Sequence, residues 1–250
     1  YRISPDMNIE DIVKVLVTGR ALTDEREIKL IEGWTLKDMD EYLAENNVLL
    51  PGEFLTAAQD NYDYDFLGSR PAGFDLEGFV FPDTYRIFNS ATAQDIVIKA
   101  LDNFDAKLDD ELRSEITRQG KSIWEIVTMA SLIEKEVRSY EDMRLVSGVF
   151  WNRIGIGQAL ESCASLAYIL GVDKAVYTTE DTQVDSIYNT YQNPGLPPGP
   201  ISNPGLNAIK AAIYPQDSDY LYFLTSNIDG STIFATTYEA HLENKRRYLR

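Results

Sequence analysis

The chain has 250 residues, of which 44% are hydrophobic, enough to bury a sizeable core in one large or two smaller domains. Its 40 acidic and 23 basic side chains give a formal net charge of −17. Because this charge repels phosphate backbones and anionic headgroups, we expect no nucleic acid among its partners.

The chain has few residues that could form disulfides or bind soft metals. Cys163 is the single cysteine and His241 the single histidine, which excludes an internal disulfide and leaves too few ligands for the usual zinc sites. No run approaches the roughly 18 apolar residues that span a bilayer. The sequence begins at Tyr1 without an initiator Met, so we expect an upstream signal or anchor outside it.

Residues 1–89 predict a small module of strands and helices. Its expected elements, in chain order, are a capped helix over residues 4–19, a strand over 28–31, a helix over 36–46 capped by Thr35, a short helix from Pro51, and a strand within 75–88. Gly33 marks a turn after the first strand, and Pro82 places part of the last one at an edge or turn. The pattern after residue 19 is that of a βααβ module.

Residues 90–250 predict a larger, mixed α/β domain, so the fold class is α+β. Its expected elements are a long helix over 92–120, a helix from Lys121, helices over 142–154, 162–170 and 204–213, a hairpin around the Asp229-Gly230 turn, and a C-terminal helix. The segment 190–204 holds five prolines and must be an ordered loop or a linker. Its aromatic and asparagine content favours an ordered loop.

The helix from Lys121 contains "MASLIEKEV" (129–137) and places a carboxylate on an apolar face. At about 100° per residue, Glu134 shares a face with Val127 and Ala130. Burial there would raise the pKa of Glu134 towards the value that a general acid needs. The alternative is an ion pair with Arg138 one turn later, which is the commoner arrangement on helical position alone. Glu136 falls on another face, where we expect solvent.

A second candidate for function is the loop Tyr188, Asn189, Thr190 and Tyr191. Its ring faces, amide and hydroxyl groups suit stacking on sugars and hydrogen bonding to them. The alternative is that these residues merely stiffen a proline-rich loop. Cys163 is more typical of a small buried side chain, and His241 of an ordinary helix-face residue.

Several strings, in this order and at these spacings, together resemble one family: "LEGFVFPDTY", "ASLIEKE", "VSGVFWNRIGIGQALES", "YNTYQNPGLPPGPISNPGLNAIKAAIYP" and "DYLYFLT". They are similar to the endolytic murein transglycosylases, the MltG or YceG-like family, and the resemblance covers nearly the whole chain. It includes "EGWTLKDMDEYLA", which is similar to the LysM-like subdomain of that family.

The resemblance implies a bacterial lyase that needs no cofactor. Members cleave the β-1,4 bond between N-acetylmuramic acid and N-acetylglucosamine within peptidoglycan strands, leave a 1,6-anhydro end, and help to end strand elongation. A single N-terminal membrane helix holds the enzyme outside the cytoplasmic membrane, and peptidoglycan synthases are possible partners. The catalytic glutamate is the first of the "EKE" motif, which corresponds to Glu134.

This chemistry can use one carboxyl group twice. Protonated Glu134 would donate to the leaving glycosidic oxygen, and its carboxylate would then take the proton of the muramic acid 6-hydroxyl as that oxygen attacks the anomeric carbon. Hydrolytic glycosidases, in contrast, usually divide these roles between two carboxyl groups.

The resemblance has one departure in the proposed cleft. Many members read Gln-Ser-Asp-Pro-Thr where this chain has Glu161-Ser162-Cys163-Ala164-Ser165, so an acidic group is lost at 163 and another occurs at 161. The expected substrate-binding residues are Asn152, Arg153, Glu161, Ser162, Tyr188, Asn189, Thr190 and Tyr191.

Three other functions remain open from the residues. The first is a cell-wall binding module without catalysis. The second is an ordinary hydrolase, in which Glu134 works with a second carboxylate such as Glu161 or Asp83. The third is a pyridoxal-phosphate lyase, which would require Lys135 to form a Schiff base.

Overall fold

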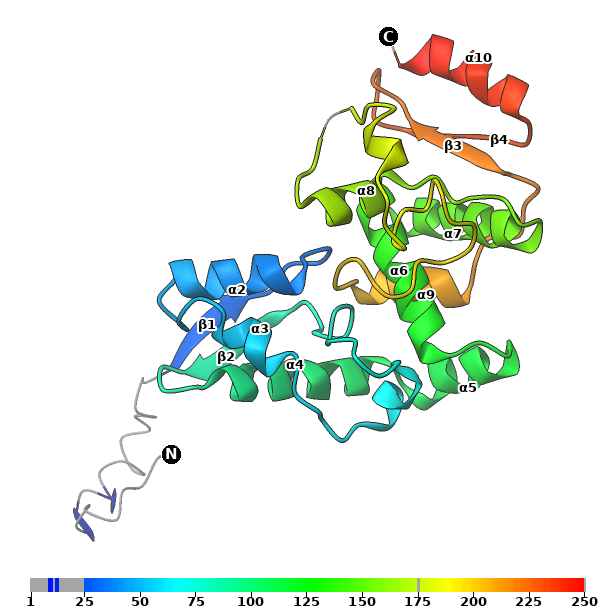
Figure 1. Cartoon of the computed structure of the whole chain (residues 1–250). Helices are drawn as coiled ribbons and strands as arrows, with labels where there is room; N and C mark the ends of the chain where they lie inside the picture. The colour runs from blue at the N-terminus through cyan, green and yellow to red at the C-terminus, as the bar shows by residue number, and fades with distance from the viewer. Residues whose placement is uncertain (1–8, 11, 14–24, 175, 250) are drawn as a thin grey trace.

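The computed structural model describes residues 9, 10, 12, 13, 25–174 and 176–249. The helix predicted over residues 4–19 therefore lies largely outside the described residues. The elements of the first lobe in Figure 1 are β1 (Glu25–Lys29), α2 (Leu36–Glu45), α3 (Glu53–Ala57), the 3-10 helix η1 (Asp65–Ser69), β2 (Thr84–Phe88) and α4 (Ala93–Lys107). The elements that follow are α5 (Asp110–Arg118), α6 (Ile123–Glu136), α7 (Tyr140–Gly155), α8 (Cys163–Leu170), η2 (Asp181–Gln183), α9 (Leu206–Ile213), β3 (Tyr222–Thr225), β4 (Thr232–Ala235) and α10 (Tyr238–Tyr248).

The first lobe has the predicted strand, helix, helix, strand order, but its first strand spans Glu25–Lys29 rather than residues 28–31. β1 and β2 pair antiparallel, with Ile28 opposite Tyr85, and both of these side chains are buried. A capping box between Thr35 and Asp38 starts α2, as predicted from Thr35. The buried carboxylate of Asp40 on α2 accepts hydrogen bonds from backbone N–H groups at the start of α3, which holds the two helices together. The likeness of this module to LysM stays a prediction.

The segment 75–88 forms a strand only from Thr84 onward. Gly78 adopts a left-handed φ of +91°, which a regular strand does not allow. The side chains of Phe79, Val80 and Phe81 are buried, so their apolar character reflects core packing rather than strand pairing. The strand prediction was therefore wrong for residues 75–83.

The single helix predicted over residues 92–120 is two helices. α4 ends at Lys107, and the side chain of Asp109 accepts a hydrogen bond from the backbone N–H of Leu112 to cap α5. Such a local cap stabilises a new helix start in place of continued helix. Apolar periodicity on both sides of the break hid it in the sequence.

α6 lies at the centre of the molecule in Figure 1 and packs against α5, α7, α8 and α9. Every residue from 126 to 133 is buried, so this helix is covered on all sides and has no solvent face along that stretch. One continuous hydrophobic cluster runs from Ile28 in the first lobe to Ile213 at the end of α9. The division of the chain at residue 89 stays a prediction.

The proline-rich loop before α9 is ordered, as its composition indicated. Most of its residues from 197 to 204 are buried, and the indole N–H of Trp124 donates to the backbone carbonyl of Pro198 at 3.0 Å. The C-terminal hairpin is also confirmed, with Tyr222 of β3 opposite Ala235 of β4 and α10 packed on both strands. No helix in the described part of the chain combines the length and the apolar character needed to cross a membrane.

Candidate active site

Glu134 lies in the last turn of α6, at the point where this buried helix reaches an open groove. The side chain is half-buried, and its Oε2 accepts a hydrogen bond from the backbone N–H of Gly205 at 2.9 Å. Gly205 is the N-cap residue of α9 and has no side chain to cap that helix. No hydrogen bond from any described residue reaches Oε1, so this oxygen is the one available to a ligand.

The groove at Glu134 has a volume of about 610 Å³ and is lined mainly by polar groups. Its residues come from the end of β1 and the turn after it, from the segment before β2, and from the end of α6. They are Lys29, Leu30, Ile31, Glu32, Gly33, Pro82, Asp83, Thr84, Glu134, Lys135, Glu136, Val137 and Arg138, with Asp173 from beyond α8. The first lobe thus forms one wall of the groove and α6 forms the other.

Burial raises the pKa of Glu134 to about 7, and the nearby negative charge of Glu32 contributes in the same direction. The Gly205 N–H, Lys135 and Arg138 act against this shift by favouring the ionised form. No ion pair within 4 Å joins Glu134 to Arg138 in the part of the chain that the structure describes. A carboxyl group that titrates near neutral pH can both give and take a proton.

The raised pKa of Glu134 predicts a pH-dependent stability effect for Glu134→Gln. The pKa of Glu134 is near 4.5 in the unfolded chain and about 7 in the folded protein, so the fold disfavours the ionised form. Stability is therefore lost as the pH rises through this range. We expect no stabilisation by the substitution at pH 4. At pH 8 we expect a gain of about 1–2 kcal/mol in the free energy of unfolding, reduced from the full linkage value because the group is partly exposed.

Urea denaturation of both proteins at the two pH values measures this difference. The amide keeps an oxygen that can accept from Gly205, so the hydrogen bond is matched in the two proteins. An equal stability difference at both pH values would show that the ionisation of Glu134 is not disfavoured by the fold.

Glu136 is not the solvated side chain that the sequence predicted, so this part of the sequence analysis was wrong. The side chain is half-buried, and its Oε1 accepts a hydrogen bond from the hydroxyl of Ser162 at 2.5 Å. Burial raises the pKa of Glu136, while Ser162 and Arg153 oppose the shift. Because α6 ends at Glu136, the segment before α8 can lie over a face that helical periodicity treats as open.

Asn152 and Arg153 on α7 hold backbone segments together. The amide of Asn152 donates to the carbonyls of Ser218 and Tyr220. The buried guanidinium of Arg153 donates to the carbonyls of Leu221, Ala159 and Leu160, and it forms an ion pair of 3.4 Å with exposed Glu161. In this structure, both side chains use these donors to fix the hairpin and the segment before α8, and neither lines the groove at Glu134.

Of the residues from Tyr188 to Tyr191, three contact side chains of α8, and none of the four lines the groove at Glu134. Asn189 and Thr190 are buried, and the Thr190 hydroxyl accepts from the backbone N–H of Ser162. The Tyr188 ring packs on Tyr168 with 5.1 Å between centroids, and the Tyr191 hydroxyl lies 3.2 Å from the Cys163 sulfur. Through Ser162, this loop is connected to Glu136 rather than to Glu134 directly.

A second hollow adjoins the groove and shares Lys135 and Asp173 with it. It has a volume of about 450 Å³ and lies between α2 and α8. Its lining includes apolar Ile201, the ring of Tyr168 and several carboxylates. The two hollows therefore lie next to each other between the first lobe and α8.

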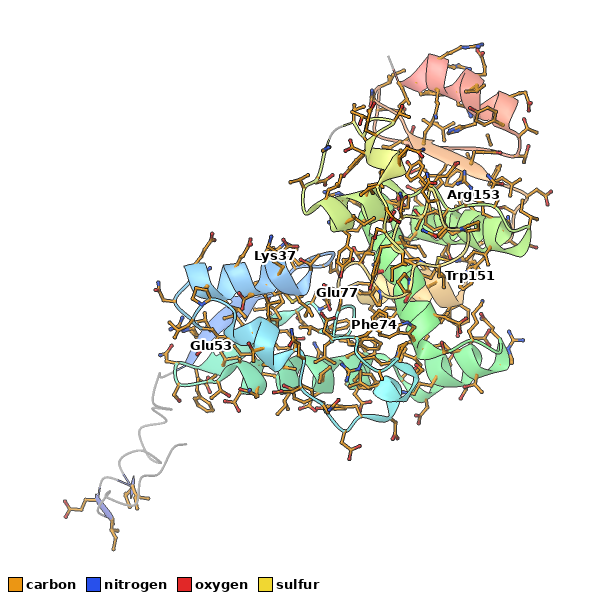
Figure 2. All side chains as sticks on the ribbon, in the orientation of Figure 1. Lys37, Glu53, Phe74, Glu77, Trp151 and Arg153 are labelled. Atoms are coloured by element: carbon orange, nitrogen blue, oxygen red, sulfur yellow. The ribbon has the colours of Figure 1, made fainter. Side chains whose placement is uncertain are left out.

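Sequence reasoning missed a buried polar cluster of Glu77 and Asn203 that joins the first lobe to the loop before α9. The Asn203 amide donates to Glu77 Oε1 at 2.8 Å and to the carbonyl of Trp34, and its Oδ1 accepts from the N–H groups of Gly78 and Val80. Glu77 also accepts from the first N–H of α2, and burial raises its pKa well above the ordinary value. Figure 2 shows Glu77 where the first lobe meets the part of the chain around α6. Neither residue belongs to a periodic pattern that would have indicated burial.

The residues that could bind a metal ion or form a Schiff base are His, Cys, Asp and Glu clusters and the amine of Lys135. Among the described residues, no three His, Cys, Asp or Glu side chains gather in a way that could hold a metal ion. The amine of Lys135 donates to the backbone carbonyl of Gly33 at 3.3 Å, so it connects α6 to the turn after β1.

Comparison with known proteins gives the same family along the whole chain. The model of the YceG-like family matches residues 1–247. A relative from Bacillus subtilis (strain 168), named endolytic murein transglycosylase, is 36% identical over 174 residues, which cover 70% of this chain and 48% of that protein. A relative of the same name from Streptococcus pneumoniae (serotype 2, strain D39) is 32% identical, with 100% of this chain and 50% of that protein covered.

The fold comparison agrees. A crystal structure of a protein from Listeria monocytogenes, described as YceG-like, superposes with a TM-score of 0.79 at 33% identity, covering 97% of this chain and 83% of that chain. The chain spans about half the length of the curated relatives that it matches. On the match along residues 1–247 and the shared fold, this chain belongs to the YceG-like family.

Proposed function

We propose that this chain carries the catalytic part of an endolytic lytic transglycosylase. Its substrate would be the β-1,4 bond between N-acetylmuramic acid and N-acetylglucosamine inside peptidoglycan strands. The observation that carries the proposal is a half-buried carboxyl group, Glu134, whose pKa is raised to about 7 and which lines an open groove. The names of the relatives from Bacillus subtilis and Streptococcus pneumoniae support the same activity.

The proposed reaction uses Glu134 first as an acid and then as a base. The protonated carboxyl group donates its proton to the glycosidic oxygen while the bond from that oxygen to the muramic acid anomeric carbon breaks. The carboxylate then takes the proton of the muramic acid 6-hydroxyl, and its oxygen bonds to the anomeric carbon to close a 1,6-anhydro ring. No water is consumed, and Glu134 ends protonated as it began.

The Gly205 N–H gives this cycle a fixed geometry. It holds Oε2 of Glu134 at 2.9 Å, so the carboxyl group cannot rotate freely and Oε1 would be the oxygen that meets the substrate. A positioned proton donor contributes typically 10²–10⁴-fold to the rate. The hydrogen bond also limits the rise in the pKa, so the group can still ionise near neutral pH.

An endolytic enzyme must bind sugars on both sides of the cleaved bond. We propose that the strand follows the surface that continues from the groove at Glu134 past Lys135 and Asp173 into the second hollow. The ring of Tyr168 in that hollow offers an apolar face for a sugar. Tyr188 supports this ring from behind by packing against it.

We propose other roles for the remaining residues that the sequence predicted to bind substrate. Ser162 would contact the strand or orient Glu136 at the groove. Asn152, Arg153, Asn189 and Thr190 would shape the wall by holding its backbone. Glu161 and Tyr191 would lie near the rim beside Cys163, where the family's acidic residue is absent.

The cellular setting is also part of the proposal and rests on the family resemblance. The enzyme would act outside the cytoplasmic membrane, held by a single membrane helix. There it would cut new strands and help to end their elongation, next to the peptidoglycan synthases that make them.

One observation favours a second function, a hydrolase with two carboxylates. Asp83 lines the same groove as Glu134, and its Oδ2 accepts a hydrogen bond from Asn103 at 2.9 Å. A second carboxylate in a glycan groove is the arrangement that activates water in hydrolytic glycosidases. The two reactions differ in their products, because hydrolysis adds water to the new sugar end and transglycosylation does not.

Incubation with insoluble peptidoglycan tests whether the protein is an enzyme or only a binding module. We expect the wild type to sediment with peptidoglycan and to release soluble fragments, and Glu134→Gln to sediment equally but release none. Binding without release by the wild type would support the binding module and contradict the proposal.

A further inference from the structure

Two carboxylates from opposite walls of the groove converge on Gly205. Its backbone N–H donates to Oε2 of Glu134 at 2.9 Å. On its other side, the carboxyl group of Glu32 packs so closely that a Cβ at position 205 would overlap Glu32 Oε1. A side chain at position 205 would therefore displace the exposed carboxyl group of Glu32. The close approach places the Glu32 charge next to that of Glu134.

The turn that carries Glu32 is fixed by three hydrogen bonds. The backbone N–H of Gly33 donates to the carbonyl of Asn203 at 2.9 Å, and the N–H of Asn203 donates to the carbonyl of Trp34 at 2.8 Å. Lys135, the neighbour of Glu134 on α6, donates from its amine to the carbonyl of Gly33. These bonds join the first lobe to both α6 and the loop before α9.

The same turn covers part of Glu134. Gly33 has a left-handed φ of +78°, and a Cβ there would lie 3.5 Å from Cγ of Glu134. The turn thus covers one side of the Glu134 side chain, and it also carries Glu32. Both effects disfavour the ionised form of the same carboxyl group, one through desolvation and one through like charge.

We propose that Glu32 is a positioning residue whose negative charge acts on Glu134, so that the first lobe helps to keep the acid of the proposed reaction protonated. Only the effect of Glu32 on the reaction rate rests on the proposed function. The contact between the two carboxylates and Gly205 is a property of the folded chain alone.

Other charged groups line the same groove as Glu134, and they bear on the size of the effect. They are Lys29 at the end of β1, Asp83 before β2, Lys135 and Glu136 on α6, Arg138 after α6, and Asp173 after α8. Lys135 and Arg138 favour ionisation of Glu134, whereas Glu32 is the neighbouring charge that raises its pKa. Removing Glu32 therefore leaves the two cations unopposed by that charge.

Glu32→Gln tests the proposal, because it removes the charge and keeps the shape that packs on Gly205. The rate of peptidoglycan cleavage should fall at alkaline pH as the acid loses its proton. We expect this alkaline limb to move to lower pH by about half a unit, the size expected for one unit charge acting at a few ångströms through a water-like dielectric. At low pH the rate should stay within about twofold of the wild type, since the acid is then protonated in both proteins.

Two variants control for structure and for total charge. Glu32→Asp keeps the charge and should retain most of the wild-type profile. Glu45→Gln removes one exposed carboxylate at the end of α2, outside the groove, and should leave the profile unchanged. A uniform loss of rate at all pH values in Glu32→Gln, without movement of the limb, would mean a purely structural role and overturn the proposal.

A titration that needs no substrate separates this inference from the proposed function. The side-chain carboxyl carbon of Glu134 can be followed by NMR in carbon-13-labelled protein and assigned by its loss in Glu134→Gln. We expect the midpoint to be lower in Glu32→Gln than in the wild type, and unchanged in Glu45→Gln. Equal midpoints in all three proteins would refute the coupling even if Glu134 is the catalytic acid, and a shifted midpoint would support it even if Glu134→Gln stays active.

Discussion

Glu134→Gln is expected to lower the rate of peptidoglycan cleavage by about a thousandfold or more. The amide can neither donate the proton to the leaving oxygen nor take it from the 6-hydroxyl, so both halves of the reaction lose their catalyst. The variant keeps the shape of the side chain and an oxygen for the Gly205 N–H. Initial rates of soluble fragment release from purified peptidoglycan measure the effect.

A matched substitution shows whether the loss is specific. Glu111→Gln removes the same charge from an exposed position on α5, and we expect it to leave the rate unchanged. Glu134→Gln should also unfold at no lower a denaturant concentration than the wild type at neutral pH. A loss of less than tenfold would contradict the assignment of Glu134 as the acid.

Asn203→Ala is expected to lower the free energy of unfolding by about 3–5 kcal/mol. The substitution deprives the N–H groups of Gly78 and Val80 of their acceptor, and it removes the donor to the buried carboxyl group of Glu77. These groups are buried at the junction of three segments, where water cannot replace the lost bonds without opening the structure. Urea denaturation followed by circular dichroism gives the free energy.

Asn193→Ala provides the comparison within the same loop. Its amide also donates to two carbonyls, but the side chain is exposed, so water can replace those bonds. We expect a loss below about 1 kcal/mol. Similar losses in the two variants would mean that the Glu77 and Asn203 cluster does not join the segments as strongly as its hydrogen bonds indicate.

Helical periodicity gave the position of Glu134 on α6 but not the surroundings of its carboxyl group. It placed Glu134 on the apolar face of α6, and the structure shows that carboxyl group half-buried with a raised pKa. It failed for Glu136 two residues later, because a helix wheel describes the faces of one helix and not the segment before α8 that covers its end. The groove itself was beyond such reasoning, since one wall comes from the turn at Gly33, about a hundred residues earlier.

Local patterns predicted the C-terminal hairpin and the start of α2, where a side chain acts on its own neighbourhood. Thr35 begins α2 and the Asp229-Gly230 turn joins β3 to β4, as their residue types indicated. The break at Asp109 was missed because apolar spacing continues on both sides of it. The Glu77 and Asn203 pair was missed because long-range hydrogen bonds between loops leave no periodic signal in either segment.

The loop from Tyr188 to Tyr191 illustrates a limit of reading function from composition. Rings, amides and hydroxyl groups suit sugar binding, but the same groups suit the packing of a buried loop. The structure uses the amide of Asn189 and the hydroxyl of Thr190 for internal hydrogen bonds. Only the three-dimensional arrangement distinguishes donors that are available to a ligand from donors that are already used.

Cleavage of peptidoglycan in water enriched in oxygen-18 tests the central claim most directly, namely that Glu134 alone serves as acid and base while the substrate supplies the nucleophile. Mass spectrometry of the released fragments reads the new muramic acid ends. We predict 1,6-anhydro ends without the heavy isotope from the wild type, and no new ends from Glu134→Gln. Incorporation of oxygen-18 into the new ends would show attack by water and contradict the account, pointing instead to a second carboxylate such as Asp83.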